Sequence, residues 1–378
     1  MIYVVKPGDN IDAIALENNI SVNELIYDNQ VEYPYALAVG QALYIPETSP
    51  QTGRSITVNG YAYPFINKNI LEETLPYLTY LSIFSYGFTE EGALVPPLID
   101  PQFMINSSNE NNTSPILTLT PLDESGRFNN NLISSVVRNN DVQLILIDEI
   151  LAELNSKGYT GVDVDFEYIL SEDRDYFTTF VALMTNILNE AGYTVSVALA
   201  PKTSADQRGL LYEGKDYAGL GAAANSVLLM TYEWGYTYSS PMAVAPINKV
   251  RQVIEDAITQ IPSAKIDMGI PNYGYDWPLP YEKGITKART IGNIEAVNIA
   301  VRYGAVIQYD EIAQTPYFNY TDEYQTEHEV WFEDVRSMQA KFRLISEYNL
   351  RGAGYWQIMR LFRANWLLLS DTYRIIKY

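Results

Sequence analysis

The chain has 378 residues, of which 47% are hydrophobic and 19% charged, the usage of an ordinary globular protein. Its 25 Lys and Arg against 46 Asp and Glu give a formal net charge of −21. Such a charge repels phosphate backbones and anionic lipid, so we expect neither nucleic acid nor a membrane surface as a partner. The chain has no cysteine and a single histidine, His328, which excludes disulfides, thiolate nucleophiles and multi-histidine metal cages. Its chemistry must therefore use carboxylates, hydroxyls, Lys, Arg or the backbone.

The N-terminal sequence carries no targeting or membrane signal. It has no basic flank followed by an apolar run, so we expect no conventional signal peptide. No stretch reaches the ~20 apolar residues that a membrane span requires, which predicts a soluble protein. The sequence gives no prediction of the oligomeric state.

The first fifty residues predict a small module with the order βααβ. An alternating strand over 3–5 precedes a helix that Asp9 or Asn10 can cap. A second helix begins after Ser21, with a glutamate three residues later as in a capping box. A last strand covers 42–46. The polar sequence that follows contains two prolines and a glycine, a composition typical of a linker.

This module resembles the LysM family, which binds glycans containing N-acetylglucosamine, such as peptidoglycan and chitin. The residues that carry the resemblance are Tyr3, Val5, Gly8, Asp9, Ile11, Ile14, Ala15, Leu25, Asn29 and the run 39–46. The resemblance implies a glycan-binding module over 1–47, joined by a linker over 48–54 to the rest of the chain. The alternative is a small helical module without a ligand.

From residue 55 onward, short apolar runs alternate with helical patterns. The predicted strands are 55–59, 79–86, 116–120, 161–167, 194–200, 226–232, 265–270 and 352–357, and the clearest predicted helices are 142–156, 172–190 and 247–260. Eight strand–helix units predict an α/β fold, a (β/α)8 TIM barrel over 55–378, which typically needs about 250 residues. The surplus is assigned to a small α+β insertion between strands seven and eight, at about 271–331.

The fourth predicted barrel strand carries three acids in alternate positions. Alternation places Asp163, Asp165 and Glu167 on one face and apolar side chains on the other. The apolar face fits the outer helix layer, so the acids point into the barrel at the end where barrel active sites lie. Same-face neighbours are only about 6–7 Å apart, so at least one pKa should rise, as a general acid near neutral pH requires. The alternative is an acidic patch that faces trapped water or Lys202.

A magnesium site would also use carboxylates, but it usually adds acids from neighbouring strands. The neighbouring strand ends offer Tyr86, Lys202, Tyr232 and Trp356 instead. Aromatic and hydrogen-bonding groups of this kind favour a lining that binds sugar. We therefore expect no metal and no cofactor.

Residues 160–167 (TGVDVDFE) resemble the D-G-x-D-x-D-x-E signature of glycoside hydrolase family 18, retaining chitinase-like (β/α)8 enzymes, with Thr160 in place of the first acid. The family's Met-x-Tyr-Asp run appears as 230–233, and its strand-eight tryptophan matches Trp356. The strand-three Ser-x-Gly-Gly motif is not recognisable. Together with LysM, this pattern resembles the spore-cortex and germination branch, N-acetylglucosaminidases acting on peptidoglycan, which implies a spore or cell-wall location.

The resemblance implies substrate-assisted retention, in which the substrate's own acetamido oxygen is the nucleophile. Glu167 would be the general acid. Asp165 would orient the acetamido N–H and share a proton with Asp163, while Tyr232 would hold the acetamido oxygen. Trp356 would form the floor under the sugar. Further candidate sugar contacts, at or after strand ends, are Tyr86, Glu233, Trp234, Asn272 and Tyr275.

Three functions stay open at this point. The first is a peptidoglycan N-acetylglucosaminidase that cleaves β-1,4 linkages after N-acetylglucosamine. The second is a chitinase acting on chitooligosaccharides, and the third is a non-hydrolytic lectin, against which the retained Glu167 speaks. His328 lies in a charged run and is predicted at a solvated helix end.

Overall fold

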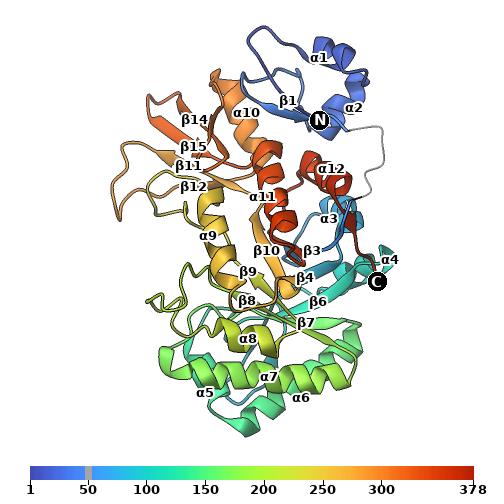
Figure 1. Ribbon diagram of the computed structural model, residues 1–378, viewed down its shortest axis with the longest axis vertical. Helices are drawn as coiled ribbons and strands as arrows, with labels where there is room; N and C mark the ends of the chain where they lie inside the picture. Colours follow the sequence, from blue (N-terminus) through green and yellow to red (C-terminus); the bar gives the residue numbers. More distant parts are fainter. Residues whose placement is uncertain (47–52) are drawn as a thin grey trace.

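The structure is a computed structural model that describes residues 1–46 and 53–378. A small N-terminal module lies at one end of the long axis, above a large barrel (Figure 1). The predicted linker, 48–54, lies outside the described residues except for Gly53 and Arg54. Across the described ranges, no helix combines the length and the apolar composition needed to cross a membrane.

The N-terminal module has the predicted βααβ order. Its elements are β1 (Ile2–Val4), α1 (Ile11–Glu17), α2 (Val22–Asp28) and β2 (Ala42–Tyr44), and the two strands pair antiparallel. The Asn10 side chain caps α1 by accepting a hydrogen bond from the Ala13 amide at 2.9 Å. Ser21 and Glu24 form the predicted capping box at the start of α2. Local capping thus fixes both helices of a module with a small core.

Eight parallel strands close into the predicted barrel. They are β3 (Ser55–Ala62), β4 (Tyr80–Phe88), β6 (Ser114–Leu119), β7 (Gly161–Val164), β8 (Thr194–Leu199), β9 (Ser226–Leu229), β10 (Ile266–Pro271) and β16 (Gly352–Trp356). Each pairs with the next in this order, and β16 pairs with β3 to complete the ring. The short strands β5 (Leu94–Val95) and β17 (Arg374–Ile375) extend the sheet beyond the ring.

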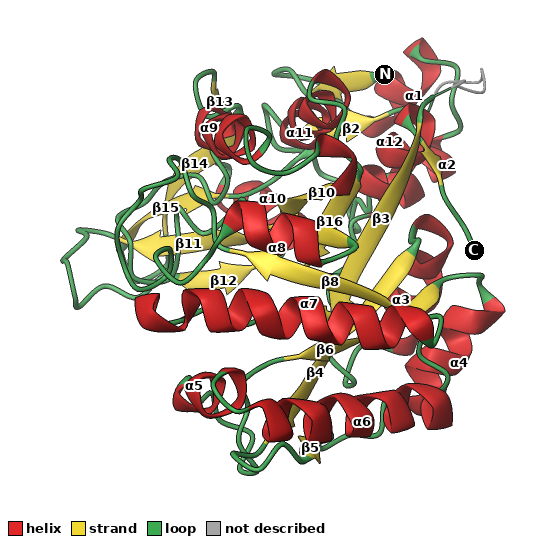
Figure 2. Ribbon diagram, turned by 60° about the horizontal axis from the view of Figure 1, so that its bottom comes forward, coloured by secondary structure: helices red, strands yellow, loops and turns green. Residues whose placement is uncertain are grey.

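Helices surround the barrel strands, with α6, α7 and α8 prominent on its outer side (Figure 2). The barrel helices are α3 (Lys68–Thr74), α4 (Gln102–Glu110), α5 (Asn131–Val137), α6 (Asn140–Lys157), α7 (Arg174–Glu190), α8 (Tyr217–Ala223), α9 (Ile247–Ala257), α11 (Val335–Glu347) and α12 (Arg363–Thr372), and short 3-10 turns cover Leu75–Tyr77, Ser171–Asp173 and Ser263–Lys265. The predicted helices 142–156, 172–190 and 247–260 correspond to α6, α7 and α9. The left-handed backbone of Gly158, with φ of +87°, ends α6 as a glycine C-cap.

The α+β insertion between the seventh and eighth barrel strands is a second sheet with one helix. Its elements are β11 (Gly274–Pro278), β12 (Arg289–Ile291), α10 (Asn293–Tyr303), β13 (Gln308–Asp310), β14 (Thr315–Thr321) and β15 (Glu327–Trp331). The strands form an antiparallel sheet in the order β12-β11-β15-β14-β13. Apolar side chains of α10 and of the sheet share a separate core.

The prediction for His328 is wrong, because this residue lies in β15 and not at a solvated helix end. Its Nδ1 lies 2.7 Å from the Asp276 carboxylate, and its ring stacks on Tyr320 at a centroid distance of 4.6 Å. Cross-strand neighbours in the inserted sheet therefore partly bury a residue whose charged sequence neighbours suggested exposure.

The N-terminal module is docked on the barrel through Arg363, at the start of α12. Its guanidinium lies 3.9 Å from the ring centroid of Tyr27 and donates to both carboxylate oxygens of Glu73 at 2.6 and 3.0 Å. The backbone amide of Arg363 donates to the Gln30 side chain, which in turn donates to the Leu361 carbonyl. One arginine thus joins the module, α3 and α12.

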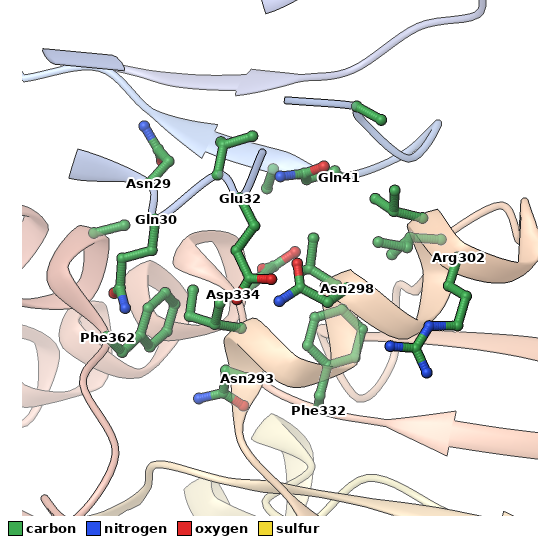
Figure 3. Close-up of a pocket in the computed structure, with 18 of the residues that line it drawn as sticks. Asn29, Gln30, Glu32, Gln41, Asn293, Asn298, Arg302, Phe332, Asp334 and Phe362 are labelled. Carbon is green, nitrogen blue, oxygen red and sulfur yellow. The ribbon is translucent and has the colours of Figure 1, made fainter. Parts of the chain in front are cut away.

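A second contact joins the module to the insertion. The Ile307 amide donates to the Val39 carbonyl at 2.9 Å, and a Cβ at Gly40 would overlap the Ile307 carbonyl oxygen. A cavity of about 260 Å³ lies between the module and α10, where the Glu32 and Asn298 side chains approach each other (Figure 3). The junction is therefore direct and partly hollow.

We predict that Arg363→Ala lowers the free energy of unfolding by about 1–3 kcal/mol, because charged hydrogen bonds and a cation–π contact are lost together. Urea denaturation followed by circular dichroism measures the change. The matched control is Arg343→Ala on the exposed face of α11, where we expect a change below about 0.5 kcal/mol. Equal effects of the two substitutions would contradict the role assigned to Arg363.

Candidate active site

The acids of β7 alternate as predicted, although the strand ends at Val164, earlier than the expected residue 167. Asp163 is fully buried inside the barrel and accepts hydrogen bonds from the Tyr61 hydroxyl at 2.8 Å and from Ser196 Oγ at 2.6 Å. Phe166 points the opposite way and contacts Phe177 of α7 at a centroid distance of 5.6 Å. This outward anchor keeps the acids on either side of it directed inward.

Burial shifts the ionisation of all three acids. It raises the pKa of Asp165 to about 8, with further raising by Glu167 and Asp163 and a smaller opposing effect of Lys215. Burial also raises the pKa of Glu167, against the effect of Lys215, and that of Asp163, against its two hydrogen bonds. The cluster therefore holds protons at pH values where exposed carboxylates have lost them.

Asp165 carries an unused acceptor. Its Oδ1 atom is buried and has no hydrogen-bond partner among the residues that the structure describes. A buried carboxylate oxygen left unpaired is unfavourable, and a donor from a bound ligand would satisfy it. The site is thus prepared to receive an N–H or O–H group at Asp165.

Tyr232 and Glu233 follow β9 and lie in the same cluster. The Tyr232 hydroxyl is buried, and burial together with Asp165 and Glu167 raises its pKa. Glu233 has a left-handed backbone, with φ of +67°, and accepts hydrogen bonds from the hydroxyls of Tyr273 and Tyr275. Two of the candidate sugar contacts, Glu233 and Tyr275, are therefore hydrogen-bonded to each other, with the Tyr275 hydroxyl 3.0 Å from Glu233 Oε1.

Trp356, at the end of β16, lies at the centre of an aromatic group. Its ring contacts Phe84, Tyr61 and Tyr63 at centroid distances of 4.9, 5.7 and 6.2 Å. Tyr61 also donates to Asp163, so the aromatic group and the acids share a side chain. This arrangement places an apolar surface beside the carboxylates, as a sugar-binding floor requires.

Two candidate sugar contacts have other partners. Tyr86 is fully buried, and its hydroxyl donates to Glu153 of α6 at 3.0 Å, so it faces the helix layer and not the acids. The pairing of β4 with β6 shifts register between Ile83 and Tyr86, which reverses the expected alternation. The Asn272 amide donates to the carbonyls of Gln357 and Arg360 and so holds the loop after β16. Trp234 is half-buried against the core.

Sequence reasoning missed several residues that line or support the site. Tyr61 was not predicted because β3 runs to Ala62, whereas the predicted strand ended at residue 59. The same alternation extended by two residues would have identified it. Lys215 lies in a segment without periodicity, and it is the lysine that acts on Asp165 and Glu167. Lys202 donates to the Lys215 carbonyl instead. In the described ranges, no group of three or more acids or histidines is arranged to hold a metal ion.

Comparison with known proteins extends this picture. The profile "Glycosyl hydrolases family 18" matches residues 125–360, and that of the LysM domain matches residues 3–46. The cortical fragment-lytic enzyme of Bacillus subtilis (strain 168) is 42% identical, over 100% of this chain and 99% of that protein.

Two solved structures cover the whole chain. The spore cortex-lytic enzyme SleL of Bacillus megaterium QM B1551 has a TM-score of 0.93 at 35% identity, with 99% of that chain covered. SleL of Bacillus cereus has a TM-score of 0.83 at 36% identity, with 87% covered. With a matching profile over most of the barrel and full-length relatives above 30% identity, this chain belongs to glycosyl hydrolase family 18 and carries an N-terminal LysM domain.

Proposed function

We propose that the protein is a retaining β-N-acetylglucosaminidase that cleaves β-1,4 linkages after N-acetylglucosamine in spore-cortex peptidoglycan or its fragments. Full-length similarity to a cortical fragment-lytic enzyme and to spore cortex-lytic enzymes supports this substrate. The LysM domain supports a peptidoglycan or chitin-like glycan as partner and a location at the spore or cell wall. The observation that carries the proposal is the unpaired, buried Asp165 oxygen beside Glu167, which suits the N–H of a 2-acetamido group.

In the first step, Glu167 donates its proton to the glycosidic oxygen as the bond to the sugar breaks. Burial raises the pKa of Glu167, so this side chain keeps its proton to higher pH than an exposed glutamate does. The acetamido carbonyl oxygen of the same sugar attacks the anomeric carbon and closes an oxazolinium ion. Water then opens this ring from the face that the leaving group vacated, with Glu167 as the base, and two inversions retain the configuration.

Asp165 and Tyr232 position the acetamido group. Asp165 Oδ1 accepts the acetamido N–H, and the negative charge that Asp165 gains as its proton moves to Asp163 stabilises the positive charge that develops on the ring. The Tyr232 hydroxyl donates to the carbonyl oxygen and aims it at the anomeric carbon. Asp163, held by Tyr61 and Ser196, can share a proton with Asp165 as charge redistributes along the reaction. Trp356 supports the apolar face of the pyranose.

We predict that Glu167→Gln lowers turnover of soluble cortex fragments by about 10²–10⁴-fold, because the general acid is lost. Binding should survive, since the amide keeps the size of the side chain. Mass spectrometry of the products measures turnover, and calorimetric titration measures binding. Glu190→Gln, at the exposed end of α7, is the matched control and should behave as wild type. Unchanged turnover in Glu167→Gln would remove the assignment.

The same measurements separate the other two functions. Faster turnover of chitotetraose than of cortex fragments would favour a chitinase, because muramic residues carry lactyl or lactam groups that chitin lacks. Binding without any product from wild-type protein would favour a lectin.

We also predict that Asp165→Asn stabilises the protein at pH 8. The pKa of Asp165 is about 8 in the folded state, above its ordinary value of 3.8, so its stability contribution is complete below pH 4 and is lost as the pH rises toward 8. The neutral amide removes this loss and should raise the free energy of unfolding by on the order of 1–3 kcal/mol at pH 8.

Urea denaturation at pH 4, 6 and 8 tests this dependence. The gain of Asp165→Asn over wild type should grow with pH and be small at pH 4. The control is Asp148→Asn on the exposed face of α6, which should change stability by less than about 0.5 kcal/mol at every pH. An Asp165→Asn variant no more stable than wild type at pH 8 would show that burial does not destabilise the ionised acid.

A further inference from the structure

Lys215 is a fully buried cation that forms no ion pair within the described part of the chain. Its ammonium donates to the Phe166 carbonyl oxygen and lies 5.5 Å from the centroid of the Phe177 ring. Lys341, which is equally buried, meets the Glu333 carboxylate at 2.7 Å. A buried ammonium without a contacting carboxylate is unfavourable, so we expect a nearby negative charge to stabilise Lys215 in this position.

The backbone seats Lys215 against the segment that carries the acids. A Cβ at Gly214 would overlap the Ile169 carbonyl oxygen, so only glycine allows this close approach. Phe166 stands between Asp165 and Glu167 in the chain, so the bond to its carbonyl holds the ammonium behind both acids. On the other side, the Lys202 ammonium donates to the Lys215 carbonyl at 3.2 Å.

The acidic groups around Lys215 outnumber the other basic groups there. The acids and hydroxyls of the cluster come from β3, from β7 and the residues after it, and from the residues after β9; they are Tyr61, Asp163, Asp165, Glu167, Tyr232 and Glu233. The remaining charged groups are Arg174 at the start of α7, Lys202 after β8 and Asp216 at the N-cap of α8. Within the described chain, Lys215 is the cation that lowers the pKa of both Asp165 and Glu167. Burial lowers the pKa of Lys215 itself to about 8, against the effect of the two acids, so it is charged near neutral pH.

We propose that Lys215 is a positioning residue whose ammonium supplies the counter-charge of the Asp165–Glu167 pair, so that the pair can hold one negative charge beside one proton once Asp165 has passed its own proton to Asp163. The proton is the one that Glu167 gives to the leaving oxygen, and the charge on Asp165 faces the oxazolinium ion. Lys215 does not touch the sugar and acts through the two acids. This inference rests on the proposed function of the site.

The test is the pH dependence of kcat/KM on soluble cortex fragments, which reports the ionisation of the free enzyme. Lys215→Gln keeps a donor for the Phe166 carbonyl and removes the charge. Loss of a nearby positive charge makes both acids hold their protons to higher pH, so both limbs of the profile should move upward by about one pH unit. On the acidic limb, activity should therefore fall about tenfold relative to the maximum of the variant. A purely structural role would scale the whole profile without moving it.

Two further variants complete the test. Lys202→Gln removes the neighbouring buried ammonium, which does not act on the acids, and should leave both limbs at their wild-type pH. Lys215→Arg keeps the charge and should leave the acidic limb in place. Lys215→Met provides a second neutral variant if Lys215→Gln does not fold by circular dichroism.

Limbs that stay in place in a folded neutral variant, or that move equally in Lys202→Gln, would overturn the inference. Failure of the proposed function looks different. In that case wild-type protein releases no product, or Glu167→Gln releases it as fast as wild type.

Discussion

The alternation of side chains along one strand of a closed barrel governs the chemistry of this protein. A closed parallel ring has a dry interior and an apolar exterior, and each strand must divide its residues between them. On β7 and the residues after it, Val162, Val164 and Phe166 face the exterior, and Phe166 packs against Phe177 and Phe180 of α7. The alternate positions carry three carboxylates, and because of the alternation these side chains point into the barrel. Tyr61 and Ser196 donate hydrogen bonds to Asp163, and Asp165 keeps a buried oxygen without a partner among the described residues.

This arrangement sets stability against function. Each buried acid resists ionisation, which weakens the folded state as the pH rises, and in the proposed mechanism the same resistance keeps a proton available for transfer. The buried ammonium of Lys215 lowers the pKa of Asp165 and Glu167 and so limits this resistance to ionisation. The surrounding barrel has a large apolar core that tolerates the unfavourable charges at its mouth.

Much of this fold and site follows from sequence patterns, because both depend on short-range regularity. Alternation on β7 and the capping residues of the N-terminal module are local, and the sequence predicts them well. The failures have long-range causes. Tyr86 faces outward because β4 shifts register against β6, and His328 is partly buried by partners on other strands. Lys215 has no pattern around it, and only the approach of its segment to the loop after β7 brings it to the acids.

The docking of the N-terminal module through Arg363 and Gly40 has a consequence for how a polymer is handled. A flexible tether raises the local concentration of substrate over a range of distances, whereas a docked module offers one distance and one angle. The LysM domain, which holds the glycan strand, and the active site, where the strand is cleaved, therefore stay at one distance and one angle from each other.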